Sequence, residues 1–202
     1  MTARRGGGPP PHEVRLIGGQ WKRSKLPVAD RPGLRPTPDR VRETLFNWLG
    51  QDLAGWRVLD AFAGSGALGF EAASRGAAQV VLLERDAELV RSLKASQQRL
   101  NAGALTVQPA DALVWMASQA PGRFDLVLLD PPFDAGLLPP ALKVAAPLVA
   151  PNGWLYVESG APLQEPLPEG FAAWRDGRAG AVFYHLLRRS SYTAAEPADD
   201  QE

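Results

Sequence analysis

The chain contains no cysteine, only two histidines and no long hydrophobic run, and each absence excludes a class of protein. Without cysteine there is no disulfide framework, no thiolate metal site and no cysteine nucleophile, which excludes chemistry such as methylation at carbon 5 of a pyrimidine. His12 and His185 are distant in the sequence and make a poor metal cluster. No apolar run approaches a membrane span, and the first dozen residues lack a signal-peptide core. We expect a metal-free, cytoplasmic protein without a membrane partner.

Opposite charges balance over the whole chain but are unevenly distributed along it. The 202 residues, of which 45% are hydrophobic, suit one medium-sized α/β domain with a small appendage. Residues 1–42 carry ten Lys or Arg against three acids, whereas the remainder carries 12 against 19. Such asymmetry indicates an anionic partner. The alternative is a solvated basic arm, which we prefer for Arg4 and Arg5 in the Gly/Pro-rich start.

The stretch from Phe124 to Phe133 organises the rest of the chain. It begins as a largely apolar run, typical of a strand buried in a parallel sheet, and ends in Asp130, Pro131, Pro132 and an aromatic residue. Two prolines remove two backbone donors, so neither sheet nor helix continues through them. Asp130 is therefore expected at the carboxyl end of a central strand, where open α/β sheets bind ligands. There a carboxylate, a carbonyl and a ring could hold a planar group bearing an NH2. The alternative is an ordinary strand-ending turn.

A glycine turn follows the first core strand, Val58–Phe62, and fits G-x-G-x-x-G from Gly64 to Gly69. Alone, this pattern also suggests a nicotinamide or flavin dinucleotide fold. Asp60 argues against it, because a fixed anion beside the turn would repel pyrophosphate but attract the ammonium of S-adenosylmethionine. Glu84 ends the next strand, 24 positions after Asp60, where an acid can bind both ribose hydroxyls.

Polar groups also follow Glu84 and the third strand, Leu105–Val107. Arg85 either stacks on the ligand or is solvated. Asp111 could accept a hydrogen bond from an adenine amino group, with the Ala112 amide as a donor. The alternative for Asp111 is the N-cap of a helix over 112–118, and both roles can hold together.

The basic N-terminal region predicts a hairpin followed by a helix. Val14–Ile17 and Gln20–Val28 are expected to form two strands joined by a glycine turn. Its basic side chains, with Trp21 among them, suit phosphate contact and base stacking; the alternative is a packing element anchored by Trp21. Thr37 is the predicted N-cap of a helix running to about residue 50, with Arg42 on its surface.

Strands alternate with helices, which predicts an α/β fold: a seven-stranded doubly wound Rossmann-like sheet with one antiparallel strand, plus the small N-terminal β-hairpin. The segment from Phe171 to Arg188 is expected to close the sheet as an antiparallel pair around Gly177. Residues 189–202 read as an acidic disordered tail.

The order of these motifs resembles the seven-stranded S-adenosylmethionine-dependent amino methyltransferases, whose signature is Asp or Asn, Pro, Pro and an aromatic residue. More narrowly, residues 15–21, 35–47 and 156–159 resemble the bacterial methyltransferases that modify a guanine N2 amine of 16S ribosomal RNA. The resemblance spans roughly residues 14–188. It implies four parts: a disordered N-terminus (1–13), a basic RNA-binding hairpin and loop (14–36), a methyltransferase domain (37–188) and the tail.

The resemblance also implies roles for individual residues. S-adenosylmethionine would be bound by Asp60, Phe62, Gly64, Gly66, Glu84, Arg85, Asp111, Ala112 and Asp130. The target amine would be held by Asp130, Pro131, Pro132 and Phe133, without metal. RNA would contact Arg15, Trp21, Lys22, Arg23, Lys25, Arg35 and Arg40.

The expected partner is 16S ribosomal RNA within a small-subunit assembly intermediate, and nothing in the sequence demands more than a monomer. Two alternatives stay open. One is a related methyltransferase acting on adenine N6, cytosine N4 or a protein glutamine. The other is a nicotinamide-dependent oxidoreductase that uses the same glycine turn.

Overall fold

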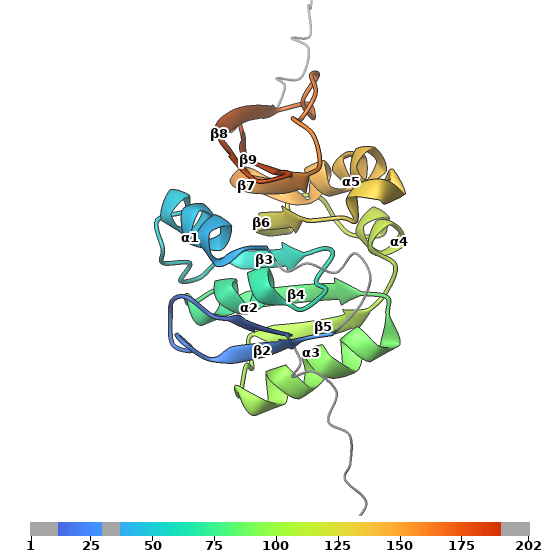
Figure 1. Cartoon of the computed structure of the whole chain (residues 1–202). Helices are drawn as coiled ribbons and strands as arrows, with labels where there is room; N and C mark the ends of the chain where they lie inside the picture. The colour runs from blue at the N-terminus through green and yellow to red at the C-terminus, as the bar shows by residue number, and fades with distance from the viewer. Residues whose placement is uncertain (1–11, 30–36, 191–202) are drawn as a thin grey trace, which may run out of the picture.

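The computed structural model describes residues 12–29 and 37–190, which form a two-stranded hairpin and a seven-stranded sheet flanked by helices (Figure 1). The sheet has the order β5-β4-β3-β6-β7-β9-β8. Its strands are β3 (Arg57–Asp60), β4 (Gln79–Glu84), β5 (Leu105–Pro109), β6 (Phe124–Leu129), β7 (Val149–Ser159), β8 (Phe171–Ala179) and β9 (Val182–Arg189). The α-helices are α1 (Asp39–Trp48), α2 (Ala67–Ser74), α3 (Ala87–Arg99), α4 (Ala112–Ala117) and α5 (Leu138–Ala145), with short 3-10 turns at Phe133–Ala135 and Ala146–Leu148.

The hairpin, β1 (His12–Arg15) and β2 (Lys25–Val28), begins two residues before the predicted boundary at 14, because His12 and Glu13 already pair with β2. Arg189, assigned to the tail by the sequence, closes β9 opposite Phe171. The rest of the predicted disordered N-terminus, Arg35, and the tail beyond Ser190 lie outside the described residues.

The direction of the strands confirms the predicted doubly wound sheet with one reversed strand. β9 is antiparallel to β7 and to β8, and the other neighbouring strands are parallel. The predicted closing turn at Gly177 is wrong. Gly177 lies inside β8 opposite Tyr184, and the turn follows Ala179. A Cβ on Gly177 would approach the Tyr184 ring to 2.4 Å, so this glycine leaves room for the ring instead of reversing the chain.

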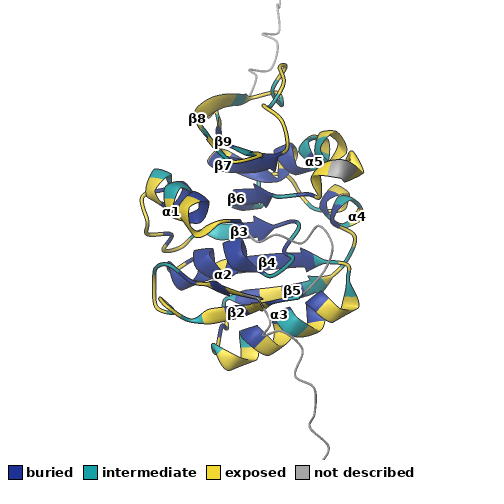
Figure 2. Cartoon of the chain, in the orientation of Figure 1, coloured by how far each residue is buried: buried dark blue, intermediate teal, exposed yellow. Residues whose placement is uncertain are grey.

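Helices cover both faces of the sheet, so the sheet has a core on each side. The central strands are accordingly coloured as buried in Figure 2. Side chains alternate along each strand, so Leu126 and Leu128 face one core while Val127 and Leu129 face the other. The first core is closed by the hairpin, α1, α2 and α3, and the second by α4 and α5. This two-sided burial explains why the central strands are almost entirely apolar.

Helix α1 differs from the sequence prediction at two residues. Pro38 occupies the N-cap position and no side chain caps the helix, so the predicted cap by Thr37 is wrong. Arg42, predicted on the surface, is 0% exposed. Its guanidinium donates to the Glu71 carboxylate (3.3 Å) and to the backbone carbonyls of Arg15 (2.8 Å) and Thr37 (3.2 Å). Tertiary partners therefore override the amphipathic pattern here.

The two glycines of the hairpin connection pack against α2. The amide of Gln20 donates to the Ser74 carbonyl at 2.8 Å, and a Cβ on Gly19 would lie 1.8 Å from the same oxygen. Glu71 accepts the amides of Ile17 and Gly18, each at 2.8 Å. Gly18 and Gly19 thus permit a close approach of backbone to helix, and Glu71 joins the hairpin to the domain.

Candidate active site

The carboxyl ends of β3, β4 and β6 meet at one edge of the sheet and bring together the acids that the sequence singled out. β3 lies between β4 and β6, where the strand order reverses, and Asp60, Glu84 and Asp130 stand at or just after the three strand ends. Such a switch point is where open α/β sheets bind ligands. The predicted site is therefore assembled by the topology.

The glycine turn between β3 and α2 is held by the end of β4. Gly64 and Gly66 have φ of 52° and 79°, the left-handed region that glycine enters without strain. The Gly64 amide donates to Oε2 of Glu84 at 3.0 Å, while Oε1 of the same carboxylate accepts from the Asp86 amide at 2.8 Å. Each oxygen keeps a second lone pair. Glu84 can therefore fix the turn and still accept ribose hydroxyls.

Asp60 faces the interior more than the ligand edge. The residue is 2% exposed, and its Oδ2 accepts from the Gly69 amide at 2.9 Å. Burial raises the pKa of Asp60 to about 7, because desolvation outweighs the hydrogen bond from Gly69. A positively charged ligand near this carboxyl would favour its ionised form again.

Replacing Asp60 by asparagine is expected to stabilise the ligand-free protein at pH 8. The folded pKa of about 7 exceeds the unfolded 3.8, so this group stabilises the fold at low pH, and the contribution is lost as the pH rises through 7. At 1.36 kcal/mol per pKa unit, Asp60→Asn should gain up to roughly 4 kcal/mol at pH 8 and little near pH 4. Urea unfolding at both pH values measures this difference. The exposed Asp176→Asn is the control, and equal stability of wild type and Asp60→Asn at pH 8 would refute the expectation.

Asp111 has the helix-capping role that the sequence left open. Its Oδ1 accepts from the amides of Leu113 (3.0 Å) and Val114 (3.1 Å) at the start of α4. The residue is exposed, so its second oxygen can still contact a ligand. Ala112 is buried, and as the first residue of α4 it directs its amide out of the helix end. Phe62, half-buried, and Arg85, exposed, flank the same edge.

Asp130 is half-buried and adjoins two buried polar residues, Thr37 and Glu158, that the sequence did not connect with it. Thr37 donates to Oε1 of Glu158 at 2.8 Å and lies 3.5 Å from Oδ2 of Asp130. Burial, followed by the charges of Glu158 and Asp60, raises the pKa of Asp130 well above its usual value. Burial also raises the pKa of Glu158. The parallel pairing of β6 with β7 is the signal that could have placed Glu158 near Asp130.

The three residues after Asp130 leave the sheet as predicted. Pro131 is buried and Pro132 is exposed. The Phe133 ring packs over Gly160, where an added Cβ would be 3.4 Å away, yet 43% of the residue stays exposed. An aromatic ring three residues after Asp130 is therefore available for stacking.

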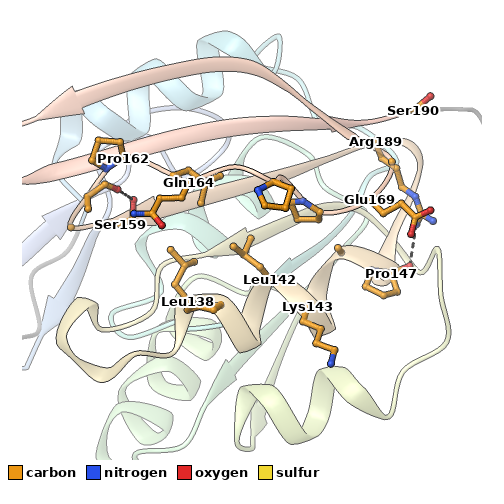
Figure 3. A pocket seen from close by; sticks show the side chains of 18 of the residues that line it. Leu138, Leu142, Lys143, Pro147, Ser159, Pro162, Gln164, Glu169, Arg189 and Ser190 are labelled. Carbon is orange, nitrogen blue, oxygen red and sulfur yellow. Dashed lines mark hydrogen bonds between the residues drawn. The ribbon is translucent and has the colours of Figure 1, made fainter.

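A large cavity lies between α5 and the segment 159–170, with Phe133 in its lining (Figure 3). Its volume is 1610 Å³, and its lining includes Leu138, Leu142, Lys143 and Arg189. None of the predicted cofactor residues lines it. The carboxylates of Asp60, Asp130 and Glu158, whose pKa values burial raises, do not line it either.

Four basic residues of the predicted RNA-binding set lie exposed around the hairpin: Arg15, Lys22, Arg23 and Lys25. Four apolar side chains of the same hairpin are buried (Val14, Leu16, Leu26 and Val28), and Trp21 is half-buried against the core. Lys25 pairs with Glu13 at 2.6 Å, and Arg15 lies 3.9 Å from Asp39. Arg40 is exposed on α1. The hairpin is thus packed on one side and cationic on the other.

Residues 12–29 and 37–190 contain neither a membrane-spanning helix nor a cluster of metal-ligating side chains. Within these ranges the helices are too short or too polar to cross a bilayer. Over the same part of the chain, no three His, Asp or Glu side chains are grouped to hold a metal ion.

The carboxylate acceptors at this edge suit a ligand that carries an adenosine and a positive charge better than they suit a dinucleotide. The carboxylates of Asp60 and Glu84 both accept hydrogen bonds from the turn between Gly64 and Gly69, so a pyrophosphate there would face two acids. The ribose and ammonium groups of S-adenosylmethionine would instead meet acceptors. The residues present therefore fit S-adenosylmethionine.

The sheet order with its single reversed strand defines a Rossmann-like methyltransferase fold. A solved structure described as a putative methyltransferase from Escherichia coli superposes with a TM-score of 0.81 at 40% identity, covering 90% of this chain and all of that one.

The chain belongs to the family described as Conserved hypothetical protein 95, which matches residues 14–188. Ribosomal RNA small subunit methyltransferase D of Escherichia coli K12 is 44% identical over 188 residues, covering 89% of this chain and 91% of that protein. The protein of the same name from Haemophilus influenzae is 40% identical over 181 residues, covering 87% and 94%. The resemblance inferred from the motifs is confirmed at the level of the family.

Proposed function

We propose that this protein transfers a methyl group from S-adenosylmethionine to the exocyclic N2 amine of a guanine in 16S ribosomal RNA. The observation that carries the proposal is the Asp130–Phe133 turn at the end of β6, beside the glycine turn of β3, in a chain whose relatives are named as small-subunit ribosomal RNA methyltransferases. The substrate class is taken from those names together with the cationic hairpin.

Orientation is the main contribution of the protein. When bound, S-adenosylmethionine supplies an electrophilic methyl group on a sulfonium. An exocyclic guanine amine is a weak nucleophile, because its lone pair is delocalised into the ring. Asp130 and the Pro131 carbonyl accept its two hydrogens, which favours a more pyramidal nitrogen and fixes its direction. Such orientation can contribute about 7–11 kcal/mol to lowering a barrier. Phe133 offers a stacking surface for the base once it has left the RNA stack.

A methyl-transfer assay followed by nucleoside analysis tests the target. Ribosomal RNA lacking its modifications, offered as naked RNA, as an assembly intermediate and as the whole subunit, should yield N2-methylguanosine. Recovery of N6-methyladenosine or N4-methylcytidine without N2-methylguanosine would refute the guanine assignment. The proposed particle is the assembly intermediate, and the proposed enzyme is a cytoplasmic monomer.

Calorimetry tests the cofactor independently of the RNA. S-adenosylhomocysteine should bind, and nicotinamide dinucleotide should not. Tight binding of the dinucleotide alone would return the chain to the oxidoreductase alternative.

Reversing the charges of Lys22 and Arg23 is expected to weaken RNA binding without slowing the chemical step. Both side chains are exposed on the hairpin connection, on the side away from the core. Each lost phosphate contact should flatten the slope of log K against log salt by roughly 0.7–0.9. Lys22→Glu/Arg23→Glu should therefore raise the Michaelis constant for RNA and leave the turnover number unchanged. The matched control is Arg175→Glu, an exposed arginine on β8 at the far edge of the sheet. Unchanged RNA kinetics would reduce the hairpin to a packing element.

A further inference from the structure

The buried carboxylate of Glu158 has no role in the chemistry proposed above, yet it stands at the end of a chain of polar groups that leads to Asp130. Glu158 is 2% exposed, and its Oε1 accepts from the hydroxyls of Thr37 (2.8 Å) and Tyr156 (2.9 Å). The Thr37 oxygen lies 3.5 Å from Oδ2 of Asp130. Thr37 is 4% exposed, so this link is shielded from water.

The effect of these polar groups on Asp130 depends on where the hydrogen of the Thr37 hydroxyl lies. A threonine hydroxyl has a single hydrogen to donate. The Thr37 hydroxyl donates to Glu158 at 2.8 Å and to Asp130 at 3.5 Å, so its hydrogen is held mainly by Glu158 and only weakly by Asp130. The hydrogen bond from Thr37 lowers the pKa of Asp130, but burial and the charges of Glu158 and Asp60 raise it by more. Glu158 therefore raises the proton affinity of Asp130 in two ways: by its charge, and by drawing the Thr37 hydrogen away from Asp130.

We propose that Thr37 and Glu158 are positioning residues that prepare Asp130 to accept the proton released by the target amine. The inference rests on the proposed amino methyl transfer. In that reaction the amine nitrogen forms the new N–C bond with its lone pair, and the electrons of the C–S bond remain on the sulfur of the sulfonium donor. One N–H proton then passes to the Asp130 carboxylate.

Two carboxylates act on Asp130 directly, and further ionisable groups lie behind them. Burial, then Glu158 of β7 and Asp60 of β3, raises the pKa of Asp130. Behind Glu158 lie Tyr156 of the same strand and Arg42 of α1, whose charge opposes the rise in the pKa of Glu158. Tyr184 of β9 faces the Tyr156 hydroxyl. Removing the charge of Glu158 should therefore lower the pKa of Asp130.

Glu158→Gln provides the first test, measured with S-adenosylmethionine and unmodified ribosomal RNA. The turnover number should fall at least about 10-fold, since a positioned base contributes roughly 10²–10⁴-fold. The acid limb of the pH–rate profile should move to lower pH, which a purely structural role would not cause. The Michaelis constant for RNA and the dissociation constant for S-adenosylhomocysteine should stay within about twofold of wild type. The control Glu43→Gln removes an exposed carboxylate of α1 and should change neither rate nor profile.

Thr37 provides a second test that leaves every charge in place. Thr37→Ser keeps the hydroxyl and should retain most of the turnover, whereas Thr37→Val should lose as much as Glu158→Gln. The inference is wrong if Thr37→Val turns over like wild type, or if the acid limb of Glu158→Gln does not move. Thermal unfolding shows whether Glu158→Gln is misfolded. If it is, the comparison of Thr37→Ser with Thr37→Val tests the inference. If the wild-type protein methylates an amine other than guanine N2, the proposed target is wrong. The same kinetics, measured on that amine, would still test the role of Glu158.

Discussion

Asp130→Ala is expected to reduce the turnover number by about 10²–10⁴-fold, the range associated with loss of a positioned acceptor or base. The side chain follows the last residue of β6 and, apart from Thr37 at 3.5 Å, has no hydrogen-bond partner among the described residues, so it is free to bind an amine. Asp130 takes no part in the hydrogen bond between the Gly64 amide and Glu84 that holds the glycine turn. The dissociation constant for S-adenosylhomocysteine should therefore change less than about threefold.

Asp130→Asn is the matched control, because it keeps an acceptor oxygen but cannot take up a proton. It should retain more turnover than Asp130→Ala if holding the amine matters, and less than wild type if proton acceptance also matters. Single-turnover methyl transfer and calorimetry separate the chemical step from binding. Full turnover in Asp130→Ala would overturn the proposed contact with the amine.

Glu71→Ala is expected to cost about 3–5 kcal/mol of unfolding free energy, the usual penalty for breaking a buried ion pair. Glu71 is 0% exposed and accepts from Arg42 (3.3 Å), Arg75 (2.9 Å) and the amides of Ile17 and Gly18. Its loss leaves buried guanidinium groups without their carboxylate and two amides without an acceptor. For a protein of this size the melting temperature should fall roughly 6–20 °C.

A surface ion pair supplies the control for this measurement. Arg57 and Asp125 pair at 2.9 Å with 42% and 34% of their side chains exposed. Arg57→Met should cost no more than about 1 kcal/mol, because water screens the pair. If Glu71→Ala lowered the free energy of unfolding as little as Arg57→Met does, the contacts of Glu71 between the hairpin and α2 would not stabilise the protein.

Elements whose pattern is local were predicted correctly, because short-range rules govern them. The apolar run before Asp130 could only be a buried strand, and two prolines could only end it. The glycine turn before α2 and the N-cap at Asp111 follow from backbone chemistry within a few residues. The reversed strand β9 was expected from the two-strand finish, although its turn was misplaced.

The errors share one physical cause, which is that tertiary contacts outweighed local preference. Thr37 has the composition of an N-cap, but its hydroxyl binds Glu158, far away in the sequence. Arg42 lies on a helix face that looked solvated and is buried instead beside Glu71. Gly177 resembles a turn residue, yet it makes room for Tyr184. A single sequence does not show which residue, distant along the chain, will contact each of these three positions.

The amino-acid sequence by itself determined the doubly wound sheet, the acids at its carboxyl edge and the family, since periodicity and motif order are properties of the chain. Only the tertiary structure decided that Asp60 is buried against Gly69, and that Thr37 and Glu158 lie behind Asp130. The reason is electrostatic: desolvation and neighbouring charge alter a carboxyl group only after folding has removed water and brought distant residues together.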